Sequence, residues 1–354
     1  MSRYLSRRFD KLTPYTPGEQ PKIDNLIKLN TNESPFQPSP KAVIETQKEL
    51  SRLNLYSDPE CSKFLKKLSG VLGVKDTQVI ATNGSDEILN FAFMAYCDSE
   101  TEVAFPDITY GFYKVFAELY NLNYREIPLK DDLTIDYKDY LGINKTIFIA
   151  NPNAPTGIYL TLDKIEDIIK SNPDNIIVID EAYVDFGNES AIRLIDKYDN
   201  LLVTGTFSKS RSMAGARLGF GVASESIIKD LQTIRYSTNP YNINRMTLAA
   251  GYGVLCDEEY TKANLKTIID NREYLSRELK KSGFSMTVST ANFIFAKHEK
   301  TAGEYLYKKL RERNILVRHF NKEKIKDYLR ITIGTREDME ILIRNLREII
   351  AEAQ

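Results

Sequence analysis

The chain has 354 residues, of which 42 % are hydrophobic and 27 % are charged, and its formal net charge is −1. This composition is ordinary for a soluble globular protein and excludes a disordered, collagen-like or disulfide-stapled chain. Because 48 Lys and Arg are balanced by 49 Asp and Glu, we do not expect a dedicated nucleic-acid binder.

Cysteine and histidine are too sparse to predict a metal centre. Cys61, Cys97 and Cys256 lie far apart without a CxxC pair, and only two histidines are present. The basic start of the chain is followed by no apolar segment, and no run approaches the roughly 18 apolar residues of a membrane span. We therefore expect a cytoplasmic protein with no metal ligands and no membrane partner.

The first two segments of the chain are an N-terminal arm and a large α/β domain. Residues 1–40 form the arm, whose part from 11 to 40 is rich in Pro, Asn and Thr and is expected to be extended. Residues 41–257 begin with helices at 42–53 and 62–72, and β-rich runs then alternate with amphipathic stretches. That alternation predicts strands at 79–81, 103–105, 146–150, 176–180, 201–206 and 218–223, and helices at 85–96, 110–119 and 162–170. It is typical of a mostly parallel sheet between helices.

The third segment, residues 258–354, predicts a smaller α+β domain, to which the arm contributes. Its expected helices are 258–281, 302–313 and 336–351, and its expected strands are 284–288, 293–296, 316–318 and 328–333. A large sheet domain beside a smaller one usually holds its ligand between the two.

A group of polar residues follows the predicted strand 201–206. Thr206, Ser208 and Lys209 come at its end, and Arg217 lies shortly beyond. Parallel α/β sheets bind ligands at such strand ends, hydroxyls and an arginine fork can hold a phosphate, and a lysine removed from water can form a Schiff base. A lone lysine is usually a solvated surface residue, but the convergence of these groups favours a site.

Two further motifs stand at strand ends. Asp180 ends the apolar run 176–180, so its carboxylate should face the crevice opposite a cation such as a protonated pyridine nitrogen; the alternative is a capping or loop carboxylate. Tyr183 follows closely and can bind a phenolic oxygen. Ser85 and Asp86 open a helix, where backbone N–H groups bind phosphate, although Ser85 is also a good N-cap.

Aromatic and basic residues complete the candidate set. Tyr110 is placed to stack on an aromatic ring, with a core role as the alternative. Arg330 lies inside an apolar strand, where an unpaired cation is costly, so an anionic ligand or a carboxylate partner is expected. The chain has no GxxxxGK[ST], GxGxxG, HExxH or GxSxG motif, so we expect a lysine, a tyrosine or a cofactor to move protons.

In order and position these motifs resemble the fold-type I pyridoxal-phosphate aminotransferases over nearly the whole chain, and among them the histidinol-phosphate aminotransferases. The resemblance lies in residues 14–19 (PYTPGE), 28–36 (KLNTNESPF), 38–40, 56–59, 83–87 (NGSDE), 180–183 (DEAY), 207–209 (FSK) and 329–335 (LRITIGT). It implies a mostly parallel seven-stranded sheet in the large domain, pyridoxal 5'-phosphate as cofactor, and a homodimer with shared active sites.

The resemblance also implies roles for individual residues. Lys209 would be the Schiff-base lysine and proton carrier, Asp180 would keep the pyridine nitrogen protonated, and Tyr183 would bind the cofactor's O3′. Further cofactor contacts would come from Ser85, Asp86, Tyr110, Thr206, Ser208 and Arg217, and from Tyr56 of the neighbouring subunit. The family often has Asn directly before Pro-Thr-Gly; this chain has Ala154 there, and Asn153 is the nearest substitute.

The implied reaction transfers the amino group of L-histidinol phosphate to 2-oxoglutarate in histidine biosynthesis. Arg330 would bind the anionic groups of both substrates. Arg318 would add a contact unless it forms a surface ion pair, and Tyr15 and Asn32 would line the pocket. The alternatives are a threonine-phosphate decarboxylase, a broad aromatic aminotransferase and a non-enzymatic cofactor-binding regulator; the last would need a basic recognition segment, which is not visible.

Overall fold

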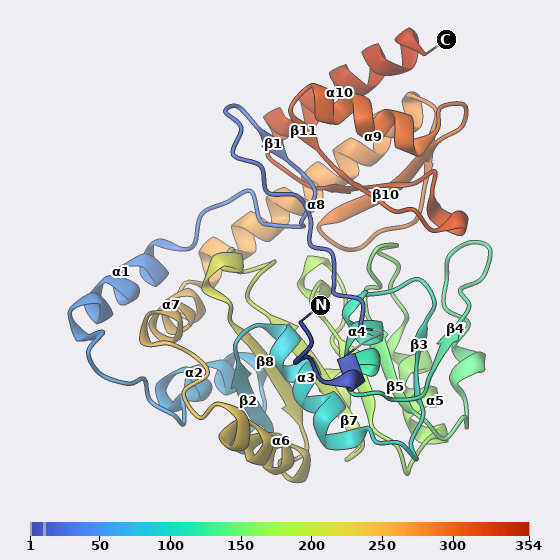
Figure 1. Ribbon diagram of the computed structural model, residues 1–354. Helices are drawn as coiled ribbons and strands as arrows, with labels where there is room; N and C mark the ends of the chain where they lie inside the picture. The colour runs from blue at the N-terminus through green and yellow to red at the C-terminus, as the bar shows by residue number, and fades with distance from the viewer. Residues whose placement is uncertain (1, 10–11, 354) are drawn as a thin grey trace.

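The structure is a computed structural model that describes residues 2–9 and 12–353. Figure 1 shows a large sheet with helices on both sides and a smaller C-terminal unit beside it. The long helix α8 (Glu258–Lys281) runs from the side of the larger unit into the smaller one. The division of the chain at residues 40 and 257 stays a prediction.

The larger unit is built on a seven-stranded sheet with the order β2-β8-β7-β6-β5-β3-β4. Neighbouring strands are parallel except around β8, which runs antiparallel to both β2 and β7. The strands are β2 (Val79–Thr82), β3 (Val103–Pro106), β4 (Tyr124–Ile127), β5 (Thr146–Ala150), β6 (Ile177–Asp180), β7 (Leu201–Thr206) and β8 (Gly219–Ala223). The expected mostly parallel seven-stranded sheet is confirmed.

The central strands are buried on both faces, because successive side chains enter opposite apolar clusters. Phe148 and Val178 pack toward α3 (Ser85–Tyr96), α4 (Phe112–Leu119) and α6 (Glu225–Thr238). Ile149 and Ile179 pack toward α5 (Leu162–Ser171) on the other face. Each such side chain contributes about 1.5–3 kcal/mol relative to exposure. A third cluster joins α2 (Ser62–Leu72) and α7 (Arg245–Leu255) beside α1 (Pro40–Glu49).

The smaller unit is a four-stranded antiparallel sheet with the order β12-β13-β10-β9, packed against helices. Its elements are β9 (Phe284–Met286), β10 (Phe293–His298), β12 (Arg318–His319), β13 (Leu329–Thr332), α9 (Gly303–Glu312) and α10 (Arg336–Glu352). The arm joins this unit through β1 (Ile27–Lys28), which pairs in parallel with β11 (Ile315–Leu316). Short 3₁₀ turns lie at 7–9, 50–52, 76–78, 137–140, 184–186, 191–194, 214–216 and 323–325.

Strand β4 and the helices α6 and α7 of the larger unit were not predicted from the sequence. Strand β4 stands at the sheet edge and is mostly half-exposed, so its apolar signal is weak. Helix α6 has buried residues at helical spacing, and its omission is an error of interpretation. Helix α7 contains Gly251 and Gly253, which are poor helix formers. A Cβ at Gly253 would lie 2.5 Å from the carbonyl oxygen of Lys41, so close packing on α1 explains this composition.

Several predicted ends are also corrected. The first helix starts at Pro40, because Ser39 caps it, and it stops at Glu49 rather than residue 53. The helix expected from 110 begins at Phe112. The strand expected at 316–318 is divided, since residue 316 pairs with the arm and residue 318 pairs with β13. The N-cap of α3 is Gly84, and Ser85 is the first helical residue.

Candidate active site

A cavity of about 130 Å³ lies where β5, β6 and β7 end, beneath the smaller unit. It is lined by Ser85, Asp86, Tyr110, Ala150, Ala154, Asp180, Ala182, Tyr183, Thr206, Ser208, Lys209 and Arg217. The structure therefore brings together every predicted cofactor contact except Asn153 and Tyr56. Parallel strands deliver these residues because their carboxyl ends meet at one edge of the sheet.

Asp180 is the buried acid of the cavity, with only 4 % of the residue exposed. Its carboxylate accepts hydrogen bonds from three neutral donors: the Tyr113 hydroxyl at 3.0 Å, the Thr204 hydroxyl at 3.3 Å and the Ala182 N–H at 3.3 Å. Burial raises the pKa of Asp180 to about 6, and the Tyr113 hydrogen bond opposes that rise. A carboxylate held by neutral donors favours a cationic partner in the cavity.

Lys209 is the half-buried amine of the cavity. Its Nζ donates to the carbonyl oxygen of Thr31 at 3.2 Å and lies 5.9 Å from the centre of the Tyr183 ring. Burial lowers the pKa of Lys209 to about 8, and the guanidinium of Arg330 is the next cause. A substantial neutral fraction of this amine near pH 8 makes it a competent nucleophile and base.

The phenol of Tyr183 is oriented by the arm. The Asn32 Nδ2 donates to its hydroxyl at 2.9 Å. Asn32 is itself held, since its N–H donates to the Thr332 hydroxyl at 3.0 Å and its Oδ1 accepts from the same hydroxyl at 3.1 Å. Its φ of 56° is left-handed, a conformation that Asn tolerates better than most residues. The Asn32 amide is therefore committed to Tyr183.

The start of α3 and Arg217 form an anion cradle. Ser85 and Asp86 present the first N–H groups of the helix, which attract a phosphate. Asp86 accepts from Arg217 Nη2 at 3.1 Å and from the Tyr110 hydroxyl at 2.5 Å, so its own charge is compensated. A Cβ at Gly84 would lie 2.6 Å from the Arg217 Nη2, and glycine is therefore needed for this close approach.

Arg330 is a half-buried cation with a buried Nε, and its hydrogen bonds are incomplete. Its Nη2 donates to the carbonyl oxygen of Asn30 at 2.9 Å, whereas its Nε has no partner in the described residues. The rings of Phe293 and Phe320 lie 5.5 and 5.7 Å from the guanidinium carbon. Burial lowers the pKa of Arg330. Of the two expected partners, the described chain supplies no carboxylate, and the anionic ligand stays a prediction.

Arg318 and Tyr15 belong to the connection between the arm and the cavity rim. Arg318 donates to the carbonyl oxygens of Thr16 at 3.2 Å and Pro17 at 3.4 Å, so it tethers the arm instead of forming the surface ion pair considered above. The Tyr15 ring stacks on Phe112 at 4.4 Å between centroids and lies 6.3 Å from the Tyr110 ring.

Asn153 and Tyr56 are the two predicted residues that the structure places elsewhere. Asn153 donates to the Ile108 carbonyl at 3.0 Å and the Thr156 hydroxyl at 3.2 Å. These bonds turn it away, and Ala154 lines the cavity, so Asn153 does not replace the missing amide. Tyr56 is 77 % exposed and stacks on Tyr241 at 4.5 Å, outside the cavity of its own chain.

Metal and membrane features were also sought in the described ranges, 2–9 and 12–353. In them no three His, Cys, Asp or Glu side chains are arranged to hold a metal ion. No helix in the same ranges has the length and apolar character needed to cross a membrane.

Comparison with known proteins places the chain in a family. Residues 24–346 match the family described as aminotransferase class I and II. The chain belongs to this family. This aminotransferase is 49 % identical over 354 residues to a histidinol-phosphate aminotransferase of Brachyspira hyodysenteriae, with 99 % of both chains covered. It is 47 % identical over 354 residues to histidinol-phosphate aminotransferase 2 of Dechloromonas aromatica, also with 99 % of both covered.

A solved structure shows the same fold. It is histidinol-phosphate aminotransferase from Sinorhizobium meliloti in complex with pyridoxal-5'-phosphate. Its TM-score against this aminotransferase is 0.90 at 22 % identity, and 100 % of each chain is covered.

Some site residues of the aminotransferase were missed by sequence reasoning. Tyr113 lies one helical turn after Tyr110, and Thr204 lies two residues before Thr206 in the same strand, so periodicity could have placed both beside the cavity. Asn30 and Thr31 act through backbone carbonyls, which leave no side-chain signal in the sequence.

Proposed function

We propose that this chain is a pyridoxal-phosphate-dependent aminotransferase that moves the amino group of L-histidinol phosphate to 2-oxoglutarate. The products are imidazole acetol phosphate and L-glutamate. The observation that carries the proposal is the cavity in which the half-buried amine of Lys209, the buried carboxylate of Asp180 and an anion cradle meet. The names of the relatives that match along the full chain support the same activity.

The donor set of the cavity fits the cofactor. The start of α3 and Arg217 would hold its phosphate, and Asp180 would pair with its ring nitrogen. Tyr183, oriented by Asn32, would meet its phenolic oxygen. When bound, pyridoxal phosphate supplies an electron sink for the charge that develops at the substrate Cα.

Lys209 then moves the proton. Its Nζ would take the proton from the substrate Cα and would then release it to the bound cofactor, and both transfers require a base with a pKa near the working pH. The pKa of about 8 that burial gives Lys209 meets this requirement. Asp180 would keep the ring nitrogen of the bound cofactor positively charged. That positive charge would stabilise the negative charge that develops at the substrate Cα.

Arg330 recognises the substrates through their anionic groups. Histidinol phosphate carries a phosphate ester and glutamate carries a carboxylate, and a guanidinium fork pairs bidentately with either. The unpaired Nε and the half-buried position of Arg330 support this role. One arginine therefore serves both halves of the reaction, which alternate in the same cavity.

Product analysis tests the proposal. Purified protein supplied with pyridoxal phosphate, L-histidinol phosphate and 2-oxoglutarate is expected to release L-glutamate at a rate far above that with phenylalanine. With threonine phosphate no CO₂ should be released. CO₂ release from threonine phosphate, or turnover of phenylalanine that exceeds that of histidinol phosphate, would favour one of the two alternatives instead.

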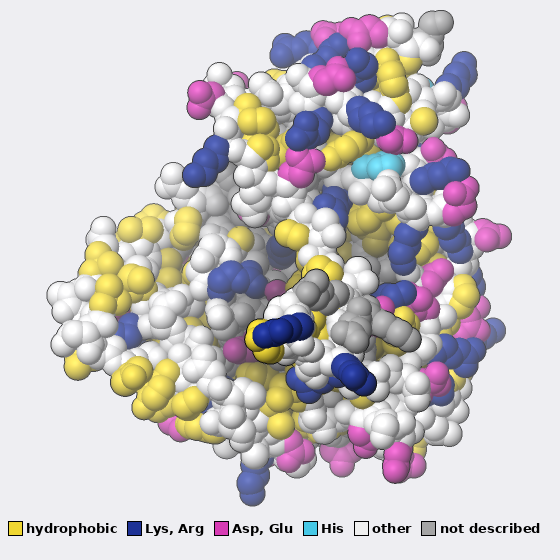
Figure 2. Space-filling model, viewed as in Figure 1, with side chains coloured by type: hydrophobic (Ala, Val, Ile, Leu, Met, Phe, Trp, Pro, Cys, Tyr) yellow, Lys and Arg dark blue, Asp and Glu magenta, His cyan; other side chains and the backbone are white. Residues whose placement is uncertain are grey.

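We also propose that the active unit is a homodimer in which Tyr56 of each subunit serves the partner's cavity. Figure 2 shows apolar side chains gathered on the flank formed by α1, α2 and α7. Val43, Ile44 and Leu50 are 45 %, 52 % and 53 % exposed there. A hollow of about 690 Å³ on this flank reaches Arg217, which leaves room for a partner's residues beside the cavity.

Mixing two inactive variants tests the shared site. In a hybrid dimer of a Lys209→Ala chain and a Tyr56→Ala chain, both defects fall in the cavity of the Lys209→Ala chain. The other cavity then has an unaltered Lys209 and an unaltered Tyr56 from its partner, so activity should recover when the variants are mixed and allowed to exchange. Sedimentation should report a dimer for the unaltered chain. A monomer, or no recovery in hybrids of demonstrated mixed composition, would contradict the shared site.

We place the reaction in histidine biosynthesis in the cytoplasm. All three cysteines, Cys61, Cys97 and Cys256, are free in the structure. Free, scattered cysteines are typical of chains kept in a reducing compartment, which supports this location.

A further inference from the structure

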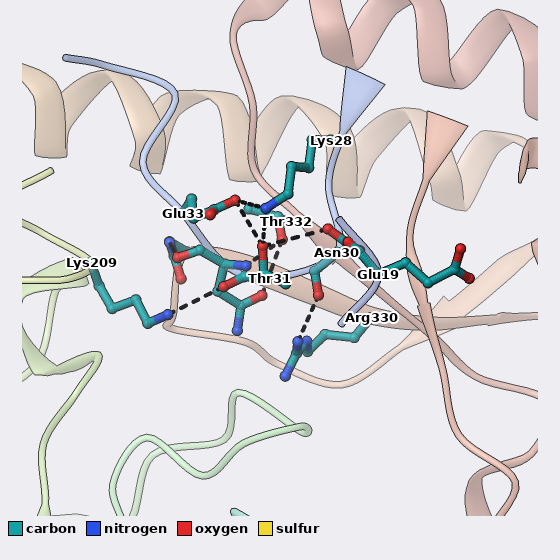
Figure 3. A network of polar contacts seen from close by, with 10 residues as sticks. Glu19, Lys28, Asn30, Thr31, Glu33, Lys209, Arg330 and Thr332 are labelled. Carbon is teal, nitrogen blue, oxygen red and sulfur yellow. Dashed lines mark hydrogen bonds and ion pairs between the residues drawn. The ribbon is translucent and has the colours of Figure 1, made fainter. Parts of the chain in front are cut away.

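Residues 30–32 of the arm pass between Lys209 and Arg330, two half-buried cations of the site (Figure 3). The carbonyl of Asn30 accepts a hydrogen bond from Arg330 at 2.9 Å, and the carbonyl of Thr31 accepts one from Lys209 at 3.2 Å. The next residue orients the phenol of the cavity. One short segment therefore sets the position of three groups of the site, each through a different residue.

A polar clasp of Lys28, Thr31 and Glu33 holds this segment. Lys28 Nζ forms an ion pair with the Glu33 carboxylate and donates to the Thr31 hydroxyl at 2.5 Å. The Thr31 hydroxyl donates to Glu33 Oε2 at 2.7 Å. The side chains of Lys28 and Glu33 are 24 % and 38 % exposed, so the pair is partly shielded from solvent. Lys28 is anchored in turn because it belongs to β1.

We propose that Glu33 is a positioning residue for Lys209, and that Lys28 balances its charge. Through the clasp, Glu33 fixes the Thr31 carbonyl that receives the Lys209 amine. Its carboxylate also places negative charge on the arm side of that amine, opposite the charge of Arg330. This inference rests on the proposed function, because the role it assigns is to support a lysine that binds the cofactor.

The charges around Lys209 determine in which direction its pKa should shift when Glu33 or Lys28 is replaced. The charged and titratable groups that face Lys209 are Glu33 from the arm, Asp86 from α3, Tyr183 after β6, Arg217 before β8 and Arg330 from β13. After burial and Arg330, which both lower the pKa of Lys209, Glu33 is the next cause and raises it. Removing the Glu33 carboxylate should thus lower the pKa of the lysine. Removing Lys28 leaves the Glu33 carboxylate uncompensated and should raise the pKa of Lys209.

With the cofactor bound, the Lys209 nitrogen titrates as an imine, which like the amine is positively charged when protonated, so the same signs are expected. The experiment follows the absorbance of the cofactor joined to Lys209 as the pH of the substrate-free holoenzyme is varied. Glu33→Gln should move the titration midpoint to lower pH by roughly half a unit to one unit, and Lys28→Met should move it to higher pH. Glu33→Asp retains the charge and should stay close to the unaltered chain. Glu312→Gln, which removes an exposed carboxylate paired with Lys309 on α9, is the matched control and should not move it.

Opposite shifts of the titration midpoint in Glu33→Gln and Lys28→Met would show that the charge of the clasp acts on Lys209. If the substitutions only loosened the arm, both midpoints would move in the same direction. Shifts of Glu33→Gln and Lys28→Met in one direction, or no shift in either, would overturn the inference while the chromophore of the unaltered chain keeps the proposed function intact. If Glu33→Gln does not fold, the other two variants still test the inference, because the titration midpoint should rise in Lys28→Met and stay unchanged in Glu33→Asp. An unaltered chain that forms no chromophore would overturn both.

Discussion

Replacing Arg330 by methionine should lower kcat/KM without lowering the free energy of unfolding. The half-buried guanidinium makes one hydrogen bond, to Asn30, and its buried Nε is unpaired in the described chain. Methionine has similar length and no charge, so it fills the same space between Phe293 and Phe320 without the unsatisfied donor. In the proposed role the anion that pairs with Arg330 arrives only with the substrate, so we expect the free protein to gain little from this cation.

The magnitudes follow from these contacts. The substitution loses one charged hydrogen bond, about 1.5–3 kcal/mol, and contacts with two rings, each about 0.5–1 kcal/mol. It relieves one unpaired buried donor, about 1–3 kcal/mol, and part of the desolvation cost of about several kcal/mol that a fully buried cation would carry. The free energy of unfolding of Arg330→Met should therefore be equal to or above that of the unaltered chain. A lost bidentate anion contact of about 3 kcal/mol should lower kcat/KM by roughly 150-fold for each substrate.

Two assays on one preparation check this. Urea unfolding of the cofactor-free protein gives the stability, and initial rates with L-histidinol phosphate and 2-oxoglutarate give kcat/KM. Arg313→Met is the control, since that arginine pairs with Glu348 and Glu352 at 2.7 Å away from the cavity; it should leave kcat/KM unchanged. A variant of Arg330 that loses several kcal/mol of stability and keeps its KM for either substrate would refute the reasoning.

Three further substitutions test the rest of the site. Asp180→Asn should lower kcat by about 10²-fold in single-turnover measurements, and an unchanged rate would contradict its pairing with the ring nitrogen. Burial raises the pKa of Glu181 to about 8, so between pH about 4.5 and 8 the folded chain holds a proton that the unfolded chain has released, and the free energy of unfolding should fall as the pH rises. Urea titrations should show a shallower fall for Glu181→Gln, and equal slopes for the two chains would contradict this role of Glu181. A Cβ at Gly219 would lie 2.4 Å from Gly84 C and 2.5 Å from Ser85 N, so Gly219→Ala should displace the start of α3 and weaken cofactor retention on dialysis, whereas unchanged retention would argue against the cradle.

The core of the site was predictable because buried parallel strands read as continuous apolar runs. Asp180 ends such a run, and Lys209 follows another, so topology alone brings them to the same edge of the sheet. The structure places both in one cavity. The smaller unit was less predictable at its short strands, where β11 and β12 each have two residues and carry little periodic signal.

The arm was predictable in location and not in contacts. Its carbonyls receive Arg330 and Lys209, and carbonyls are common to every residue type. Asn32 was expected at the substrate, whereas its amide faces Tyr183 because Thr332 holds it there. The contact between Asn32 and Thr332, 300 positions apart, depends on how the arm packs against β13, which no local pattern encodes.

Chemical trapping on the unaltered chain tests the central claim most directly. Borohydride reduction of the cofactor-loaded protein, followed by peptide mass mapping, should place the pyridoxyl group on Lys209 alone. Addition of L-histidinol phosphate before the reductant should remove that label, because the substrate amine takes the place of the lysine. A label on another lysine, or a label that histidinol phosphate leaves unchanged, would contradict the account.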